Sequence, residues 1–362
     1  MEPSTSITRP PGDSSSARPG SEPSSREIPH QELAELIARR DRGETLPRAE
    51  TPLQLGGLRL SGADLSGLDL SGADLSGASF VGCILTGSRL VSANLSGAVL
   101  QDADLSDAEL LQATMSGADL SNARLDRAGL GQVVAIDAVF FGVTCEGGTF
   151  TGADLTGSDL RAAKLSSCRA RSVNLTGVDL TNASLIEVDL GQAILHDASF
   201  RDAKLDRSRF KGIVGYKRCD WINADIHDVD FTGAWLVRRF IQDENYLHEF
   251  RSQSARHEKL YRVWSITSDC GRSLSRWAAW TVLVALIYAA AYTQVDIDWG
   301  DYRTPLSPVY YSVVTFTTLG YGDVLPGSTT AQVLVISEVI LGYFSLGGMM
   351  SILSDKMARR AG

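Results

Sequence analysis

Histidine and cysteine are scarce in this chain, with five of each among 362 residues. The cysteines form no CxxC pair, which excludes a disulfide framework and a cysteine-rich zinc site. The histidines share no ligand spacing, and the sequence offers neither a nucleophile beside a base nor a phosphate-binding loop. We therefore predict that the protein is not an enzyme and holds no cofactor.

Basic residues are also too few for a general nucleic-acid-binding protein. The 34 Lys and Arg residues are outnumbered by 43 Asp and Glu residues, which gives a formal net charge of −9. An acidic chain lacks the basic surface that phosphate backbones require. We therefore expect no nucleic-acid partner.

Apolar residues are sparse in residues 1–28, where Ser, Pro and Gly predominate. Such a segment cannot bury enough surface to offset its ordering entropy, so we expect a disordered tail. It contains no apolar stretch of the kind that a signal peptide needs. Residues 29–52 follow as a capping helix and lead-in, because Leu33, Leu36 and Ile37 share one helical face.

A large apolar residue recurs at every fifth position from Leu55 to Phe210. Leu, Phe or Met fills 29 of these 32 positions, and the exceptions are Ala135, Cys145 and Ala170. A small residue, usually Ala, stands two positions before most of them. A period of five fits neither a helix nor a strand. It fits a coil whose four walls are each five residues long, with the large and small residues pointing inward.

This pattern, clearest in Leu60-Ser-Gly-Ala-Asp-Leu65, resembles the pentapeptide-repeat family. The resemblance covers residues 53–240 and implies a right-handed quadrilateral β-helix, which we place in the cytoplasm. Residues 53–212 correspond to eight coils, a rod of about 38 Å at the usual spacing between strands.

Two irregularities interrupt the repeat. Residues 131–150 depart from the pattern and predict a bulge. After Phe210 the apolar positions fall one residue late, which predicts an insertion near residues 211–220. The displaced apolar positions, all expected to face inward, are Trp221, Ile226, Phe231 and Leu236. The cysteines at inward positions, expected as small buried hydrophobes, are Cys83, Cys145 and Cys168.

The composition changes towards the C-terminus. Residues 241–273 are charged with scattered aromatics, and we interpret them as an amphipathic linker. Residues 277–293 then contain no charge, and residues 329–353 contain only Glu338. We expect two membrane spans, at residues 274–295 and 329–353 of a pore domain that covers 274–362. Aromatic residues expected to anchor the first span at the membrane interface are Trp277, Trp280 and Tyr292.

Charge around these spans predicts their orientation. Basic residues precede the first span and follow the second, whereas the loop between them is acidic. The positive-inside rule therefore places both termini in the cytoplasm, and we expect the plasma membrane of a bacterium. The acidic residues of the loop, expected to form a negative outer vestibule, are Asp296, Asp298 and Asp301.

A re-entrant element lies between the spans. Ser307 can cap a helix and Pro308 suits its first turn, which predicts a short pore helix over residues 308–317. A segment this short cannot span, so it enters the membrane and returns. The next six residues are Thr318-Leu319-Gly320-Tyr321-Gly322-Asp323.

These six residues resemble the potassium-channel signature Thr-X-Gly-Tyr-Gly-Asp, and the resemblance covers roughly residues 260–362. It implies a homotetramer whose backbone carbonyls form a selectivity filter for permeant K⁺, with Asp323 at the outer mouth. Consecutive carbonyls that point the same way need left-handed backbone at alternate residues, which we expect at Gly320 and Gly322. The filter residues implied are Thr318, Leu319, Gly320, Tyr321 and Gly322. The Tyr321 side chain is expected to pack against a pore helix.

Two residues of the second span are candidates for further roles. Gly342 matches the hinge glycine of such channels, and close helix packing is an equal alternative. Glu338, an intramembrane carboxylate, faces either the pore cavity or a pore helix. We prefer the second placement, in which Glu338 supports the scaffold of the filter. Candidate hydrogen-bond partners there are Ser312, Thr315 and Thr317.

The sequence therefore predicts a tetrameric, potassium-selective channel with a cytoplasmic pentapeptide-repeat domain that regulates or scaffolds it. Its expected partners are the lipid bilayer and an unidentified cytoplasmic protein on the rod. The alternative is a membrane-anchored pentapeptide-repeat interaction protein that mimics DNA and binds a topoisomerase. Residues 51–200, with 17 acidic and 8 basic residues, favour this alternative.

Overall fold

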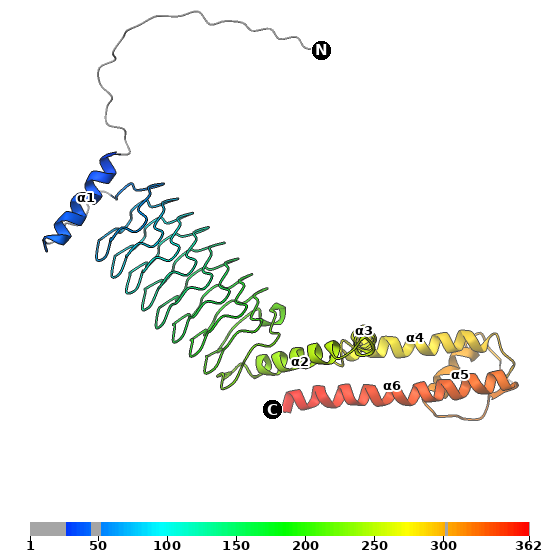
Figure 1. Ribbon diagram of the computed structural model, residues 1–362. Helices are drawn as coiled ribbons and strands as arrows, with labels where there is room; N and C mark the ends of the chain where they lie inside the picture. Colours follow the sequence, from blue (N-terminus) through cyan, green and yellow to red (C-terminus); the bar gives the residue numbers. More distant parts are fainter. Residues whose placement is uncertain (1–26, 45–51, 301–302, 362) are drawn as a thin grey trace, which may run out of the picture. The chain divides into compact units, whose positions relative to one another are not determined.

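The computed structural model describes residues 27–44, 52–300 and 303–361. These residues form two compact units, up to Asn245 and from Tyr246 onward (Figure 1). The expected disordered tail lies outside the described residues, except for residues 27 and 28, which belong to helix α1 (Glu27–Asp41). Leu33 of α1 is buried against the interior of the first unit, so this helix caps the coils as expected.

The first unit is a four-sided β-helix. Each wall contributes one bridging residue, which pairs in parallel with the residue 20 positions later, from Gln54↔Asp74 to Ile194↔Val214. The large residues at every fifth position and the small ones two residues earlier fill the interior. The second residue of each turn has left-handed backbone, as at Gly97 (φ 64°) and Asp102 (φ 57°), because the chain must bend sharply between walls.

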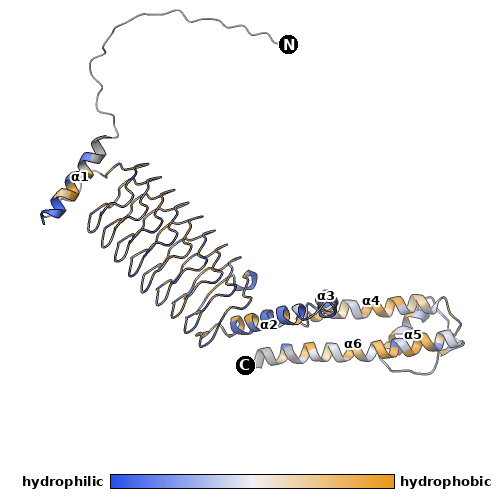
Figure 2. Cartoon of the chain, viewed as in Figure 1, coloured by the Kyte–Doolittle hydropathy of each residue, from blue (hydrophilic) through white to orange (hydrophobic). Residues whose placement is uncertain are grey.

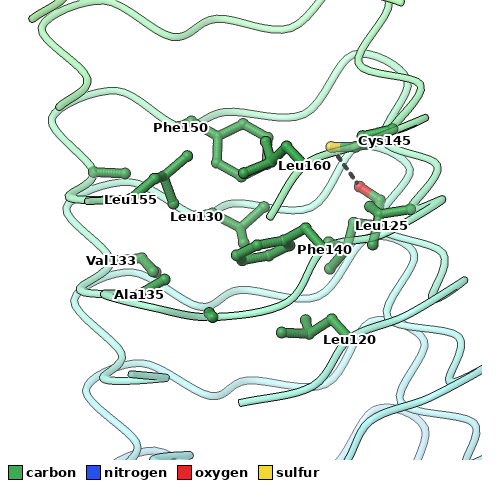
Figure 3. Packing of buried hydrophobic residues seen from close by; sticks show 14 of the residues in the cluster. Leu120, Leu125, Leu130, Val133, Ala135, Phe140, Cys145, Phe150, Leu155 and Leu160 are labelled. Carbon is green, nitrogen blue, oxygen red and sulfur yellow. Dashed lines mark hydrogen bonds between the residues drawn. The ribbon is translucent and has the colours of Figure 1, made fainter. Parts of the chain in front are cut away.

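The bulge predicted for residues 131–150 is wrong. The bridges Val134↔Asp154 and Thr144↔Lys164 keep the 20-residue register through this stretch. Figure 3 shows why the coil stays regular: Phe140 and Phe150, which are larger than Leu, occupy the same stretch of interior as the smaller Ala135 and Cys145. The larger and the smaller side chains together therefore fill the interior, and the register of the coils does not change. Cys83, Cys145 and Cys168 are buried, as predicted.

The predicted insertion after Phe210 is confirmed. The pairing offset rises from 20 to 21 residues at Ser199↔Asp220, and the short helix η1 (Tyr216–Arg218) lies in the last coil before that bridge.

The β-helix ends earlier than residue 240. Its last bridge is Arg209↔Asp230, and helix α2 (Trp235–Ser252) begins soon afterwards. Val237 and Ile241 of α2 are buried against the last coil, whereas Leu236, expected to face inward, is 49% exposed. A helix covers this end because an open coil would leave apolar side chains and unpaired backbone groups in water.

The second unit is helical. Helix α3 (Ala255–Ser268) leads to α4 (Leu274–Tyr292), and a short α5 (Ser307–Phe316) packs against both α4 and α6 (Thr329–Ala361). Strands β1 (Ile297–Asp298) and β2 (Leu325–Pro326) pair antiparallel between the helices. Two segments, Leu274–Tyr292 and Thr329–Ser354, are long and apolar enough to cross a membrane, and Figure 2 shows apolar residues along both helices.

Candidate ion-conducting site

The segment between α5 and β2 has an alternating backbone. Thr318, Gly320 and Gly322 have φ of 59°, 50° and 77°, in the left-handed region. Both glycines therefore have the conformation that the sequence predicts for them. Thr318 was not predicted, because nothing in a threonine side chain favours this conformation. Such alternation allows successive carbonyls to point to one side of the chain, which is the arrangement needed to coordinate a dehydrated cation.

The pore helix holds the start of this segment. The amide of Thr318 donates to the carbonyl of Thr315, and that of Leu319 donates to the carbonyl of Val314, both at 3.0 Å. Ser307 does not cap the helix as expected. It is the first helical residue, and its hydroxyl accepts a hydrogen bond from the amide of Thr304 at 2.8 Å instead.

The end of the segment is tied to the pore helix by a side-chain contact. The hydroxyl of Tyr310 donates to the carboxylate of Asp323 at 2.7 Å. Sequence reasoning missed Tyr310, because the two residues are 13 apart and meet only after the chain turns back. The bond fixes Asp323 against α5 and so limits the movement of the intervening backbone.

Glu338 lies at the centre of the helical unit with its side chain fully buried. Its Oε2 accepts a hydrogen bond from the hydroxyl of Tyr292 at 2.6 Å, and its Oε1 contacts the hydroxyl of Ser312. Ser312 also lies 2.7 Å from the carbonyl of Ala285. Glu338 therefore faces a pore helix, the second of the two placements considered.

Of the three candidate partners for Glu338, the structure selects Ser312. The hydroxyl of Thr317 donates instead to the carbonyl of Val313 at 2.7 Å. Tyr292 was expected at the membrane interface, but it is buried and bonded to Glu338. Trp277, another expected anchor, donates its Nε1 hydrogen to the carbonyl of Ser345 at 2.8 Å. Tyr292 and Trp277 therefore both donate hydrogen bonds from α4 to α6, and the interface role expected of Trp277 and Trp280 stays a prediction.

Gly342 permits a close approach between α6 and α5. A Cβ at this position would collide with the backbone carbonyl of Phe316, the last residue of the pore helix. The close packing of α6 against α5 is therefore sufficient by itself to require a glycine at this position. This contact does not depend on bending at Gly342, so the hinge role stays a prediction.

The acidic loop adjoins the exit of the segment. Asp298 pairs through β1 with Leu325 of β2, two residues after Asp323. A Cβ at Gly300 would lie 2.8 Å from the carbonyl of Asp323, so the loop passes close to it. Asp296 and Asp298 are exposed at this end of the unit, whereas Asp301 lies outside the described residues.

Among the described residues, no group of three or more metal-ligating side chains is close enough to hold a metal ion.

Comparisons with known proteins match two separate regions of this chain. A family model described as "Ion channel" matches residues 279–359, and a model for pentapeptide repeats matches eight copies within residues 54–212. A two pore potassium channel b of rice (Oryza sativa subsp. japonica) is 35% identical over 72 residues. This chain joins pentapeptide repeats to an ion-channel domain. The rice match spans 20% of this chain and 21% of that protein. Neither of these two families is a family of enzymes.

Solved structures similar to the pentapeptide-repeat domain include HetL, a pentapeptide-repeat protein of the cyanobacterium Nostoc sp. strain PCC 7120. It is 26% identical, with 54% of this chain and 96% of HetL covered and a TM-score of 0.23. A structure of QnrB1, a plasmid-mediated fluoroquinolone resistance protein, is 17% identical. That match covers 50% of this chain and 96% of QnrB1, with a TM-score of 0.34.

Proposed function

We propose that the protein is a potassium-selective channel that assembles as a homotetramer in a bacterial plasma membrane. The observation that carries this proposal is the left-handed backbone at Thr318, Gly320 and Gly322 within a Thr-X-Gly-Tyr-Gly-Asp segment. One strand presents carbonyls to only one side of an ion, so several copies must surround it. The permeant ion is K⁺, and no cofactor takes part.

The exposure of the filter supports assembly. Leu319 is 59% exposed and Tyr321 is 67% exposed in a single chain, although both follow the buried end of the pore helix, where Phe316 is 3% exposed. In a tetramer their side chains pack away from the axis, against the pore helix of a neighbouring subunit. In this arrangement Tyr321 holds the diameter of the filter.

The proposed orientation places both termini and the pentapeptide-repeat domain in the cytoplasm. Basic residues precede α4 and follow the apolar part of α6, whereas β1 and its flanks carry exposed acids. The pentapeptide-repeat domain regulates or scaffolds the pore through a cytoplasmic protein that binds its walls.

The test is ion flux through the purified full-length protein in liposomes. We expect K⁺ flux with little Na⁺ flux, and a tetramer by native mass spectrometry. The rival function, a membrane-anchored DNA mimic, predicts topoisomerase binding without flux. Absence of K⁺ flux from correctly inserted tetramers would overturn the proposal.

A further inference from the structure

One wall of the β-helix carries few charges. Its ladder of bridging residues runs from Gln54 to Val214, and only two of these nine residues are charged. On the wall before it in each coil, the ladder from Asp69 to Asp230 has seven charged residues among nine. We call the first of these the Val134 wall, after its middle residue. The wall that follows it has the ladder from Arg59 to Asp220, and we call it the Val139 wall.

Apolar side chains are exposed at one level of these two adjacent walls. Ile136 stands in the turn between Val134 and Val139, so it lies at the edge that the two walls share. Leu111 covers the start of the same coil, because a Cβ on Gly131 would lie 3.2 Å from the Leu111 side chain. Contiguous exposed apolar surface is typical of interaction sites. The exposed residues, at 45%, 38%, 37% and 42%, are Leu111, Val134, Ile136 and Phe141.

We propose that the pentapeptide-repeat domains of the four subunits pack two by two, with their long axes parallel, through the Val134 and Val139 walls. Adjacent walls of a four-sided coil face directions a right angle apart, and neighbours around a fourfold axis are related by a quarter turn. The Val134 wall of each copy therefore meets the Val139 wall of the next, and Ile136 faces the axis. The proposal rests on the proposed function in one respect, that the protein is a tetramer.

This packing brings apolar residues of neighbouring copies together. Fourfold symmetry sets equal levels of the rods side by side, so Val134 of one copy packs against Val139 of the next. Leu111 and Phe141 lie at the edges away from the axis, on opposite sides of the contact, and so they meet as well. The contact therefore removes from water the apolar surface that a single chain exposes.

The charges on the two walls favour a second copy of this chain as the occupant. Arg171 and Lys211 are exposed at the edge of the Val134 wall away from the axis. Asp179 and Asp220 belong to the Val139 wall, eight and nine residues further along the chain and thus at the same levels of the rod. The quarter turn sets these basic residues against the acidic residues of the neighbour. Opposite charges at matching levels fix the register of the two surfaces.

The first test asks which walls meet. Full-length protein in nanodiscs carries the pair V134C/V139C, is oxidised with copper phenanthroline and is separated on a denaturing gel. Serine replaces Cys219 and Cys270, the two native cysteines that are not buried. We expect covalent dimers, trimers and tetramers from the pair. We expect only monomers from V134C or V139C alone, because each wall meets the other wall and never itself.

The matched control is the pair K164C/R169C, which has the same spacing at exposed positions of the other two walls. It should remain monomeric on the gel. Covalent dimers from V134C alone, or equal yields from the two pairs, would overturn the proposal. Native mass spectrometry of the same samples reports the oligomeric state. A tetramer without crosslinks between positions 134 and 139 would overturn this inference and leave the proposed function standing, whereas the absence of a tetramer would overturn both.

The second test places charge at the proposed axis. Glu146 occupies the same turn position after another wall that Ile136 occupies here, so the coil tolerates I136E. Four carboxylates around the axis repel one another, and we expect the yield of crosslinked V134C/V139C to fall several-fold. I84E is the matched control, because Ile84 is 45% exposed on a different wall. Equal crosslinking yields with I136E and I84E would count against the packing.

Discussion

The carboxylate of Glu338 joins α6 to α4, because its Oε2 accepts a hydrogen bond of 2.6 Å from the hydroxyl of Tyr292. Its other oxygen contacts Ser312 of the pore helix, so one buried side chain connects three helices. Burying a polar group is costly unless its hydrogen bonds are satisfied. The arrangement therefore makes the position of the pore helix depend on Glu338.

The first prediction separates hydrogen bonding from charge at this position. In Glu338→Gln, the amide oxygen accepts from Tyr292, the amide nitrogen donates to Ser312, and Ser312 donates to the carbonyl of Ala285. We expect this variant to assemble and conduct. Glu338→Val leaves the buried Tyr292 hydroxyl without its acceptor, at about 1–3 kcal/mol per subunit. Thermal dissociation of the tetramer measures the difference. An intact Glu338→Gln tetramer with sharply reduced conductance would instead place Glu338 in the ion path.

The second prediction concerns the backbone of the filter. Gly320 has φ of 50°, where an added Cβ costs about 1–2 kcal/mol per subunit. We expect Gly320→Ala to lose K⁺ over Na⁺ selectivity or conduction, measured by reversal potentials in mixed salts. Leu319→Val is the matched control, because it retains the carbonyl and an apolar side chain. If Gly320→Ala keeps wild-type selectivity, these carbonyls do not form the filter.

The third prediction tests the contact between α6 and the pore helix. Gly342→Ala brings a methyl group onto the carbonyl of Phe316, so either helix must move. We expect a lower melting temperature of the assembly and reduced flux. Gly347→Ala lies on the same helix, where the new Cβ has no atom within 4 Å outside the adjoining backbone of that helix, and should behave like the wild type. A Gly342→Ala protein with unchanged stability that fails to open would favour the hinge role.

The fourth prediction concerns the outer vestibule. Asp296 and Asp298 are exposed beside the exit of the filter, and Asp301 follows in the same loop. In the proposed tetramer, four copies of this loop concentrate cations through a field that salt screens beyond about 8 Å at physiological ionic strength. We expect conversion of all three to Asn to lower single-channel conductance more in dilute than in concentrated K⁺. Equal fractional losses at both concentrations would argue against a field effect.

The fifth prediction is a pH dependence of the pentapeptide-repeat domain. The Ser66 hydroxyl, together with the Ser66 amide, holds the pKa of Asp64 below its ordinary value, and Ser76 and Thr232 do the same for Asp74 and Asp230. A lowered folded pKa stabilises the domain above the unfolded pKa, near 3.9, and this contribution is lost as the pH falls through the folded pKa. We therefore expect the melting temperature of the domain, followed by circular dichroism, to fall as the pH drops below about 4.

The control replaces aspartate by asparagine, a residue that already occupies the same position in another repeat of this chain. Asn94 accepts a hydrogen bond from the amide of Ser96 at 3.1 Å, in the position that Asp64 and Asp74 occupy in other repeats. Conversion of Asp64, Asp74 and Asp230 to Asn should keep these turns and flatten the pH dependence. An unchanged pH profile would assign the acid sensitivity to other carboxylates.

Much of the pentapeptide-repeat domain could be predicted from the sequence, because the residues that fill its interior are specified by the sequence close to them. Whether a side chain points inward depends only on its place within five residues, so the period predicts the coil. The one-residue shift after Phe210 likewise predicted the change in pairing at Ser199↔Asp220. The bulge predicted for residues 131–150 was wrong for a related reason. The period does not show that the large side chains of Phe140 and Phe150 fill the space left by smaller side chains in other walls.

The sequence by itself determined the coil period, the two apolar helices and the glycines of the filter, since each depends on residues close together in the chain. Only the tertiary structure decided which side chains meet across helices. Tyr292 and Glu338 are 46 residues apart, and Tyr310 and Asp323 are 13 apart. Such contacts depend on how each helix is rotated about its axis and where it crosses its neighbours. An almost uniformly apolar helix has no polar face that would reveal that rotation.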